Sequence, residues 1–107
     1  GPGYDWAIVR LGRPGRVRSI EVDTKHFKGN YPDQCSIDVC HAPNESIDGL
    51  SWTQHAWTPL MPKTKLAADT NHRFEKELAD AGPVSHVMLN IYPDGGVSRM
   101  RVFAVPE

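Results

Sequence analysis

The sequence predicts an all-β domain, an antiparallel β-sandwich or jelly roll, and three observations favour this class. Short stretches of alternating apolar and polar residues recur along the chain, which is the period of strands that bury one face. Nine glycines and nine prolines in 107 residues supply turns between them. No segment longer than one turn carries the period of a helix. About seven short strands between loops rich in proline and glycine fit two packed sheets.

The first part of the chain predicts two strands separated by a turn. Trp6–Leu11 is a short apolar run that is typical of a strand. Pro14-Gly15 suits the two central positions of a type II turn, because proline fixes φ and glycine accepts a positive φ. Arg16–Thr24 follows as a second strand. Its apolar residues break the strict alternation, which predicts a β-bulge near Arg18-Ser19.

The middle of the chain alternates between polar loops and short strands. Lys25–Gln34 is predicted as a loop, because its Gly-Asn step tolerates a left-handed backbone and its Tyr-Pro step opposes a helix. Cys35–Cys40 alternates apolar and polar residues and predicts a half-buried strand. His41–Ser51 is polar and is predicted as a surface loop. Trp52–Leu60 is ambiguous, and Met61–Asn71 is predicted to be irregular.

The last third of the chain contains the clearest strand pattern. His72–Leu78 alternates weakly, whereas Val84–Tyr92 alternates over its whole length and Ser98–Val105 does so again. Residues 93–96 between them, Pro-Asp-Gly-Gly, have the composition of a tight turn, so we expect these two strands to form a hairpin. The side chains of these strands that we expect in the core are Val87, Leu89, Ile91, Met100 and Val102.

Length, charge and apolar runs exclude several classes of protein. A chain of 107 residues fits one domain with a single core. The formal charge of −1 argues against a general electrostatic role on nucleic acid or on an acidic membrane. No apolar run exceeds four residues. A membrane span needs about 20 such residues and a signal-peptide core about 7–15, so we expect neither in this chain.

Cysteine and histidine usage argue against a disulfide and a metal site. Cys35 and Cys40 are the only two cysteines, and they lie in one predicted strand. They would face opposite sides roughly 16 Å apart, too far for a disulfide with each other. We therefore expect reduced thiols, one of them in the core, and an intracellular protein. No histidine or carboxylate spacing matches a metal site, so no metal and no other cofactor is predicted, although a site assembled from distant residues stays open.

Two strings of residues carry a resemblance to a known family. They are Val22–Pro32 and Leu89–Val102, and Tyr4-Asp5-Trp6 and Val9–Gly15 add to them in the same order. Together they resemble the repeat unit of allantoicase over nearly the whole chain. The resemblance implies a galactose-binding-like jelly roll. It also implies a hydrolase of purine breakdown, in the cytoplasm or the peroxisome, that converts allantoate and water to ureidoglycolate and urea.

The resemblance also bears on domain organisation. Enzymes of this family normally carry two repeats, and the strings around His26–Asn30 and Thr64–Thr70 are more similar to the second repeat. We therefore expect residues 1–107 to form a single repeat domain that lacks its first strand and the other repeat. Such a domain would have an open sheet edge, and open edges favour a homo-oligomer or pairing with another strand.

The chemistry of allantoate suggests which residues form a site. The substrate carries one carboxylate and two ureido groups on one carbon, so its hydrolysis needs a cation for the carboxylate, an acid for the leaving nitrogen and a base for water. We expect Asp23 and His26 to transfer protons. Arg99 is expected to bind the carboxylate through its planar guanidinium. Asn30 and Asn90 are expected to bind a ureido carbonyl. These five residues would share a cleft if the loop after Thr24 met the turn before Arg99.

Each of these residues also has an ordinary structural explanation. Arg99 fits a solvated strand face, Asp23 fits a strand end that binds loop amides, and His26 fits an exposed histidine. At the level of function, the alternative is a non-catalytic β-sandwich that binds a small ligand or a carbohydrate. A further alternative is a structural half that supports a catalytic first repeat. The sequence alone leaves these alternatives open.

Overall fold

The computed structural model describes residues 5–48, 57–93 and 95–107. Its strands are β1 (Asp5–Asp23), β2 (Gln34–Cys40), β3 (Thr58–Lys65), β4 (Asn71–Phe74), β5 (Pro83–Tyr92) and β6 (Arg99–Pro106). All their pairings are antiparallel, which confirms the predicted fold class. In the part of the chain that is described, no helix is long and apolar enough to cross a membrane.

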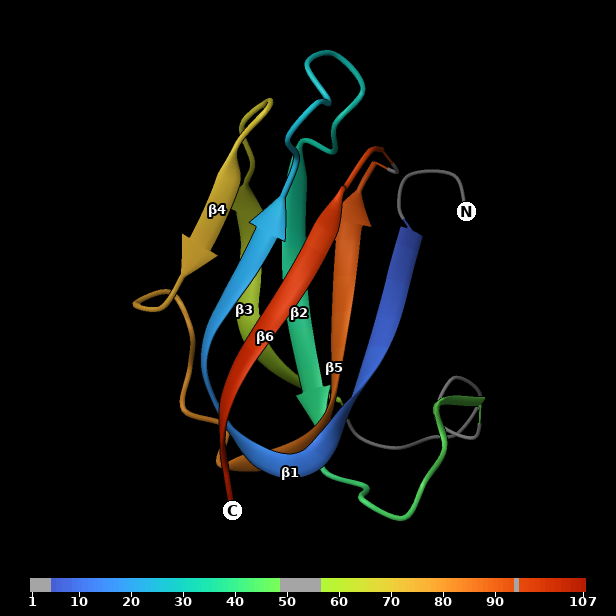
Figure 1. Ribbon diagram of the computed structural model, residues 1–107, viewed down its shortest axis with the longest axis vertical. Coiled ribbons are helices and arrows are strands. Elements are labelled where there is room, and N and C mark those ends of the chain that lie inside the picture. The colour runs from blue at the N-terminus through green and yellow to red at the C-terminus, as the bar shows by residue number, and fades with distance from the viewer. Residues whose placement is uncertain (1–4, 49–56, 94) are drawn as a thin grey trace.

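Strand β1 belongs to both layers of the fold. Its first part, over residues 5–16, pairs with β5, and its last part, over residues 15–23, pairs with β6. β4 pairs with the same last part at residues 20–23. Figure 1 shows β1 curving around one end of the molecule to join the layers. One layer therefore consists of β3, β2, β5 and the first part of β1, and the other consists of β4, the last part of β1 and β6.

The bend in β1 replaces the turn that the sequence predicted. The type II turn at Pro14-Gly15 is wrong, because β1 continues through these residues as a bent strand with a register shift against β5 just before Gly15. Gly15 is required for a different reason: a Cβ on it would lie 2.6 Å from the carbonyl oxygen of Val105 in β6. The predicted bulge near Arg18-Ser19 is confirmed by the register shift that β1 makes there against β6.

The predicted hairpin between β5 and β6 is wrong. β5 lies between β1 and β2, whereas β6 pairs with the other part of β1, so the connection over residues 93–98 crosses from one layer to the other. Its two glycines permit close packing against the loop after β1. A Cβ on Gly95 would lie 2.7 Å from the backbone nitrogen of Pro32, and a Cβ on Gly96 would overlap the ring of Phe27. Proline and glycine residues that are typical of a tight turn can therefore also form a closely packed connection between two layers.

Two strands lie in segments without a clear sequence pattern. β3 occupies a region predicted to be ambiguous or irregular. Its adjacent residues Leu60 and Met61 are both buried, and its register against β2 shifts on both sides of Ile37. β4 is short and ends at the buried Phe74. A shift in register interrupts the alternation on which strand prediction depends, which explains why β3 was not predicted.

The core lies between the two layers. Its most deeply buried apolar side chains are Ile20, Val22, Cys35, Ile37, Val39, Met61 and Val87. Among the residues predicted to be buried, Val87 and Leu89 are buried, whereas Ile91, Met100 and Val102 are only partly buried and pack against the core. Met100 and Val102 lie on β6, and Ile91 lies near the end of β5. Among the described strands β6 pairs only with β1, so no described strand pairs with its other edge.

Candidate functional site

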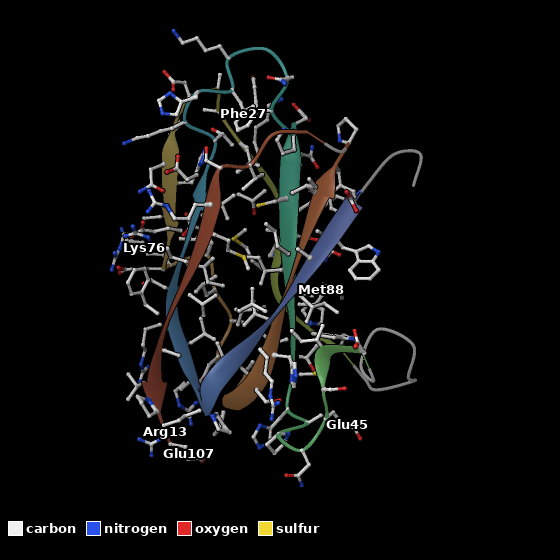
Figure 2. The ribbon with its side chains drawn as sticks, turned by 45° about the vertical axis from the view of Figure 1, so that its right-hand side comes forward. Arg13, Phe27, Glu45, Lys76, Met88 and Glu107 are labelled. Carbon is white, nitrogen blue, oxygen red and sulfur yellow. The ribbon has the colours of Figure 1, made fainter. Side chains whose placement is uncertain are left out.

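Three segments that are far apart in the sequence meet at one end of the sandwich. They are the loop over residues 24–33, the loop over residues 66–70 and the crossover over residues 93–98. Figure 1 shows these connections at the same end of the strands, and Figure 2 shows Phe27 there, opposite Arg13 and Glu107. The loop after Thr24 and the segment before Arg99 thus come together as the sequence analysis supposed.

Backbone hydrogen bonds fix the crossover against the loop after β1. The Gly96 N–H donates to the Asn30 carbonyl oxygen at 2.7 Å, and the Ser98 N–H donates to the Asp23 carbonyl oxygen at 2.7 Å. The Ser98 hydroxyl donates to the Lys25 carbonyl oxygen at 2.7 Å. Asn30 is exposed and takes part in this contact through its backbone. Its side-chain amide lies at the surface of the same end of the molecule.

Asp23 and Arg99 form an ion pair on the outer face of the layer that contains β4, β1 and β6. The Arg99 Nη2 and the Asp23 Oδ2 are 3.8 Å apart, longer than the roughly 2.7–2.9 Å of a charge-assisted hydrogen bond. The Asp23 side chain is 7 % exposed, and its Oδ1 accepts the Lys25 N–H at 2.8 Å. The Arg99 side chain is 55 % exposed. Arg99 therefore keeps donors that face solvent and are available to an anionic ligand.

His26 lies beside Asp69, a carboxylate that is not among the five site residues expected from the sequence. The His26 N–H donates to the Asp69 Oδ1 at 2.8 Å, and the Asp69 N–H donates to the Phe27 carbonyl oxygen at 3.1 Å. The His26 N–H bond, together with the charges of Lys28, His26 and Lys25, holds the pKa of the Asp69 carboxyl below its usual value. No spacing pattern indicates this contact, because 43 positions separate the two residues.

Buried Thr24 and partly buried His72 hold the loop that carries Asp69. The Thr24 hydroxyl lies 2.7 Å from the Ala67 carbonyl oxygen, to which it donates. The Thr24 N–H donates to the Thr70 carbonyl oxygen at 2.8 Å. The Ala67 N–H donates to the His72 Nε2 at 2.8 Å, so the proton of the neutral ring lies on Nδ1, which is 2.9 Å from the Val22 carbonyl oxygen. The loop over residues 66–70 is thus hydrogen-bonded, near its first and its last residue, to the segment where β1 ends.

Asn90 lies apart from the other four predicted residues. Its side chain is on the outer face of the opposite layer, where its Nδ2 donates to the Asp38 Oδ2 at 3.0 Å and to the Ser36 Oγ at 3.3 Å. The Ser36 hydroxyl is in turn 3.1 Å from the Tyr92 hydroxyl. The expectation that Asn90 shares a cleft with Asp23, His26, Asn30 and Arg99 is therefore wrong. The alternating strand pattern gives the face of a residue within its own sheet, but not which layer that sheet forms.

A cavity of about 390 Å³ opens between the layers next to Arg99. Its charged lining residues are Asp5 and Arg99. Its apolar lining includes Ala7, Val9, Leu89, Ile91, Val97 and Met100. Allantoate, the substrate that the resemblance implies, carries polar groups at every end, and burying such groups without partners is costly. The polar surface around Asp23, His26 and Arg99 therefore suits a ligand of this chemistry better than the cavity does.

The sulfur and metal chemistry of the described residues is limited. Cys35 and Cys40 are both free and buried. Burial raises the pKa of the Cys35 thiol to about 12 and also raises that of Cys40, so neither thiol is activated as a nucleophile. Across the described ranges, no group of three or more His, Cys, Asp or Glu side chains is arranged to hold a metal ion.

The comparisons with known proteins agree with this fold. The family model described as "Allantoicase repeat" matches residues 1–107. Probable allantoicase 1 of Burkholderia mallei is 53 % identical over 102 residues, which are 95 % of this chain and 30 % of that protein. A probable allantoicase of Pseudomonas paraeruginosa is 49 % identical over 106 residues, which are 99 % of this chain and 32 % of that protein.

A solved structure extends the similarity to three dimensions. The crystal structure of allantoicase from Saccharomyces cerevisiae matches with a TM-score of 0.75 and 36 % identity, over 96 % of this chain and 28 % of that one. Fold and sequence together define a β-sandwich repeat domain. The chain belongs to the allantoicase family and corresponds to its repeat. It spans about a third of the length of the curated relatives that it matches, 30 % and 32 % in these two cases.

Proposed function

We propose that this chain is one repeat of an enzyme that hydrolyses allantoate to ureidoglycolate and urea. The observation that carries the proposal is the family match over residues 1–107, supported by the 53 % identity to a protein named as a probable allantoicase. The complete protein would hold this repeat together with the other repeat. The reducing interior of the cell, the cytoplasm or the peroxisome, fits two buried free thiols.

The residues at the loop end have the chemistry that this reaction needs. Arg99 binds the substrate carboxylate with the donors that Asp23 leaves unused, since their ion pair spans 3.8 Å. His26 in its protonated form donates a proton to the ureido nitrogen that leaves as urea. Asp23 accepts a proton from the water that bonds to the central carbon as the carbon–nitrogen bond breaks. The exposed Asn30 amide binds the carbonyl of the remaining ureido group.

Urea release from allantoate by the complete protein tests this proposal. Removing a charged hydrogen-bond partner costs about 2–4 kcal/mol, or roughly 30- to 1,000-fold in turnover, so Arg99→Ala is expected to lose activity by that order. Lys65→Ala is the matched control. Lys65 is another exposed cation paired with an aspartate, 3.1 Å from Asp33, and its loss is expected to leave turnover unchanged.

Two results would contradict the proposal at different levels. Full activity of Arg99→Ala, with its fold confirmed by circular dichroism, would remove Arg99 from the site. No urea release by the wild-type complete protein would reject allantoate hydrolysis itself. In that case the structural role, in which this repeat supports another part of the protein, becomes the better explanation.

We further propose that β6 pairs with another strand in the assembled protein, either in a homo-oligomer or with a further part of the same polypeptide. β6 pairs only with β1 among the described strands, and the apolar cavity opens beside it. Phe103 and Val105 on β6 are 41 % and 50 % exposed. An unpaired edge beside an apolar surface favours strand addition.

A further inference from the structure

The loop over residues 66–70 brings a carboxylate to His26 that the proposed mechanism does not use. The Asp69 Oδ1 accepts the His26 N–H at 2.8 Å, and the Asp69 N–H returns a hydrogen bond to the Phe27 carbonyl oxygen at 3.1 Å. These two bonds run in opposite directions between the same two loops. They therefore fix the backbone of His26 relative to residue 69, not only the distance between them.

The backbone conformations of the two residues show why this contact matters. His26 has a φ of 74° and Asp69 has a φ of 50°, the two non-glycine residues with positive φ in the described chain. The left-handed region disfavours residues with a Cβ, so such a conformation persists only where surrounding bonds hold it. The direction in which the His26 imidazole leaves the backbone depends on this φ. A residue that holds the φ thus also determines where the ring points.

The Asp69 loop is a firm base for this role. Hydrogen bonds from Thr24 reach the carbonyl oxygens of Ala67 and Thr70, and His72 accepts the Ala67 N–H. The Leu66 N–H donates to the Asp33 carbonyl oxygen at 2.9 Å. The loop is therefore fixed to β1 and to the start of β2 independently of His26. Through its hydrogen bond with the His26 N–H, Asp69 holds the His26 backbone against this fixed loop.

We propose that Asp69 is a positioning residue for His26 in allantoate hydrolysis, and this inference rests on the proposed function. Asp69 holds the His26 backbone in its left-handed conformation through the acceptor Oδ1 and thereby aims the imidazole at the substrate nitrogen. It takes no proton and does not contact the reacting atoms. Its removal should therefore impair the chemical step more than substrate binding, because the carboxylate is bound by Arg99.

Two substitutions in the complete protein separate the acceptor from the backbone conformation. Asp69→Asn keeps an oxygen acceptor in the same place and tolerates a positive φ, whereas Asp69→Gly tolerates the φ but has no acceptor. Asp69 is exposed, so neither change removes core packing. If Asp69→Gly does not fold by circular dichroism, Asp69→Ser replaces it, because a serine hydroxyl is one atom too short to reach the His26 N–H.

Asp80→Gly is the matched control. Asp80 is also exposed, and its Oδ1 also accepts a backbone N–H, that of Gly82 at 3.1 Å. It lies near the bend of β1, where it also pairs with Arg16. It is thus the same kind of contact at the other end of the molecule. His26→Ala completes the set, because it tests the residue that Asp69 is inferred to serve.

The readouts are kcat, KM and the hydrogen exchange of the His26 amide. We expect Asp69→Gly to lower kcat roughly ten- to a hundredfold with little change in KM, and to speed exchange of that amide. Asp69→Asn should stay within a few fold of wild type in kcat and in the exchange rate of the His26 amide. Asp80→Gly should match wild type. Impaired turnover in His26→Ala with normal turnover and exchange in Asp69→Gly would overturn the inference alone. Wild-type turnover in His26→Ala would overturn the proposed role of His26 and this inference with it.

Discussion

Gly96 shows how one missing Cβ determines the packing of the loop end. A methyl group at this position would overlap the ring of Phe27, a residue of the loop after β1. Gly96→Ala is therefore expected to lower the free energy of unfolding by about 1–3 kcal/mol, the usual cost of overpacking. Denaturation by urea, followed by circular dichroism, measures the change.

Gly29→Ala is the matched control for this prediction. Gly29 lies in the loop after β1, as Phe27 does, and a Cβ on it meets no atom within 4 Å. Its substitution should leave stability nearly unchanged. Equal stability of the two variants would show that Phe27 moves aside at no cost, and that the crossover does not depend on a glycine at residue 96.

The Asp69 carboxylate gives the loop contact a defined dependence on pH. Its pKa is lowered from 3.8, first by the His26 N–H and then by nearby positive charges. A carboxyl with a lowered pKa stabilises the fold fully above its unfolded pKa and loses that contribution as the pH falls through the folded value. We therefore expect the His26–Asp69 contact to persist down to about pH 4 and to weaken below it.

An NMR titration of the His26 amide measures this dependence. Its chemical shift should move with a midpoint below 3.8, the reference for an unperturbed aspartate. The shift should be absent in Asp69→Asn, which has no carboxyl to titrate. A midpoint at or above the reference would show that the hydrogen bond does not favour the charged carboxylate in solution.

At this scale the sequence predicts some site residues better than others. Asp23 and Arg99 end and begin their strands, so strand boundaries alone place them near connections, and the structure pairs them at 3.8 Å. Asp69 was not selected, because its contact with His26 depends on two loops 43 positions apart. Asn90 was grouped with the wrong residues, because alternation does not state which layer a strand joins.

Strand β2 buries a cysteine and thereby keeps its thiol unreactive. Cys35 is fully buried on its inner face, and its pKa is about 12. The thiolate is the reactive form of cysteine, and burial keeps the Cys35 thiol almost wholly protonated near neutral pH. We expect the folded chain to resist a thiol-exchange reagent at Cys35, whereas the chain in urea reacts rapidly. Equal rates at this residue in both conditions would mean that β2 opens readily.

The strands themselves were predicted unevenly, for physical reasons. β5 alternates over its full length, and its predicted bounds, 84–92, lie within those observed. β3 has adjacent buried residues, Leu60 and Met61, at a register shift, so its pattern is interrupted. The connection between β5 and β6 misled the prediction, because proline and glycines suit a hairpin turn and also suit the crossover that the structure contains.

At the scale of the whole molecule, the open edge of β6 predicts that copies of the chain associate. If β6 pairs through its open edge, the mean mass of the isolated chain should rise with concentration in sedimentation experiments. Val105→Lys, which places a charge on β6, should reduce this rise. Ile47→Lys is the control, because Ile47 is 40 % exposed but lies outside β6. A constant monomer mass for the wild type would contradict the proposed pairing.

The shared strand β1 has a consequence for how the chain is made. Ile8 pairs with Met88, and Ile20 pairs with Val102, so each of these β1 residues pairs with a residue that is synthesised at least 80 positions after it. While the ribosome extends the chain, β1 has neither of its two longest ladders and must remain without them until β5 and β6 emerge. Contacts of such high sequence separation form slowly, and an unpaired strand is prone to aggregation. Chaperones that hold the unfinished chain should therefore raise the yield of folded protein.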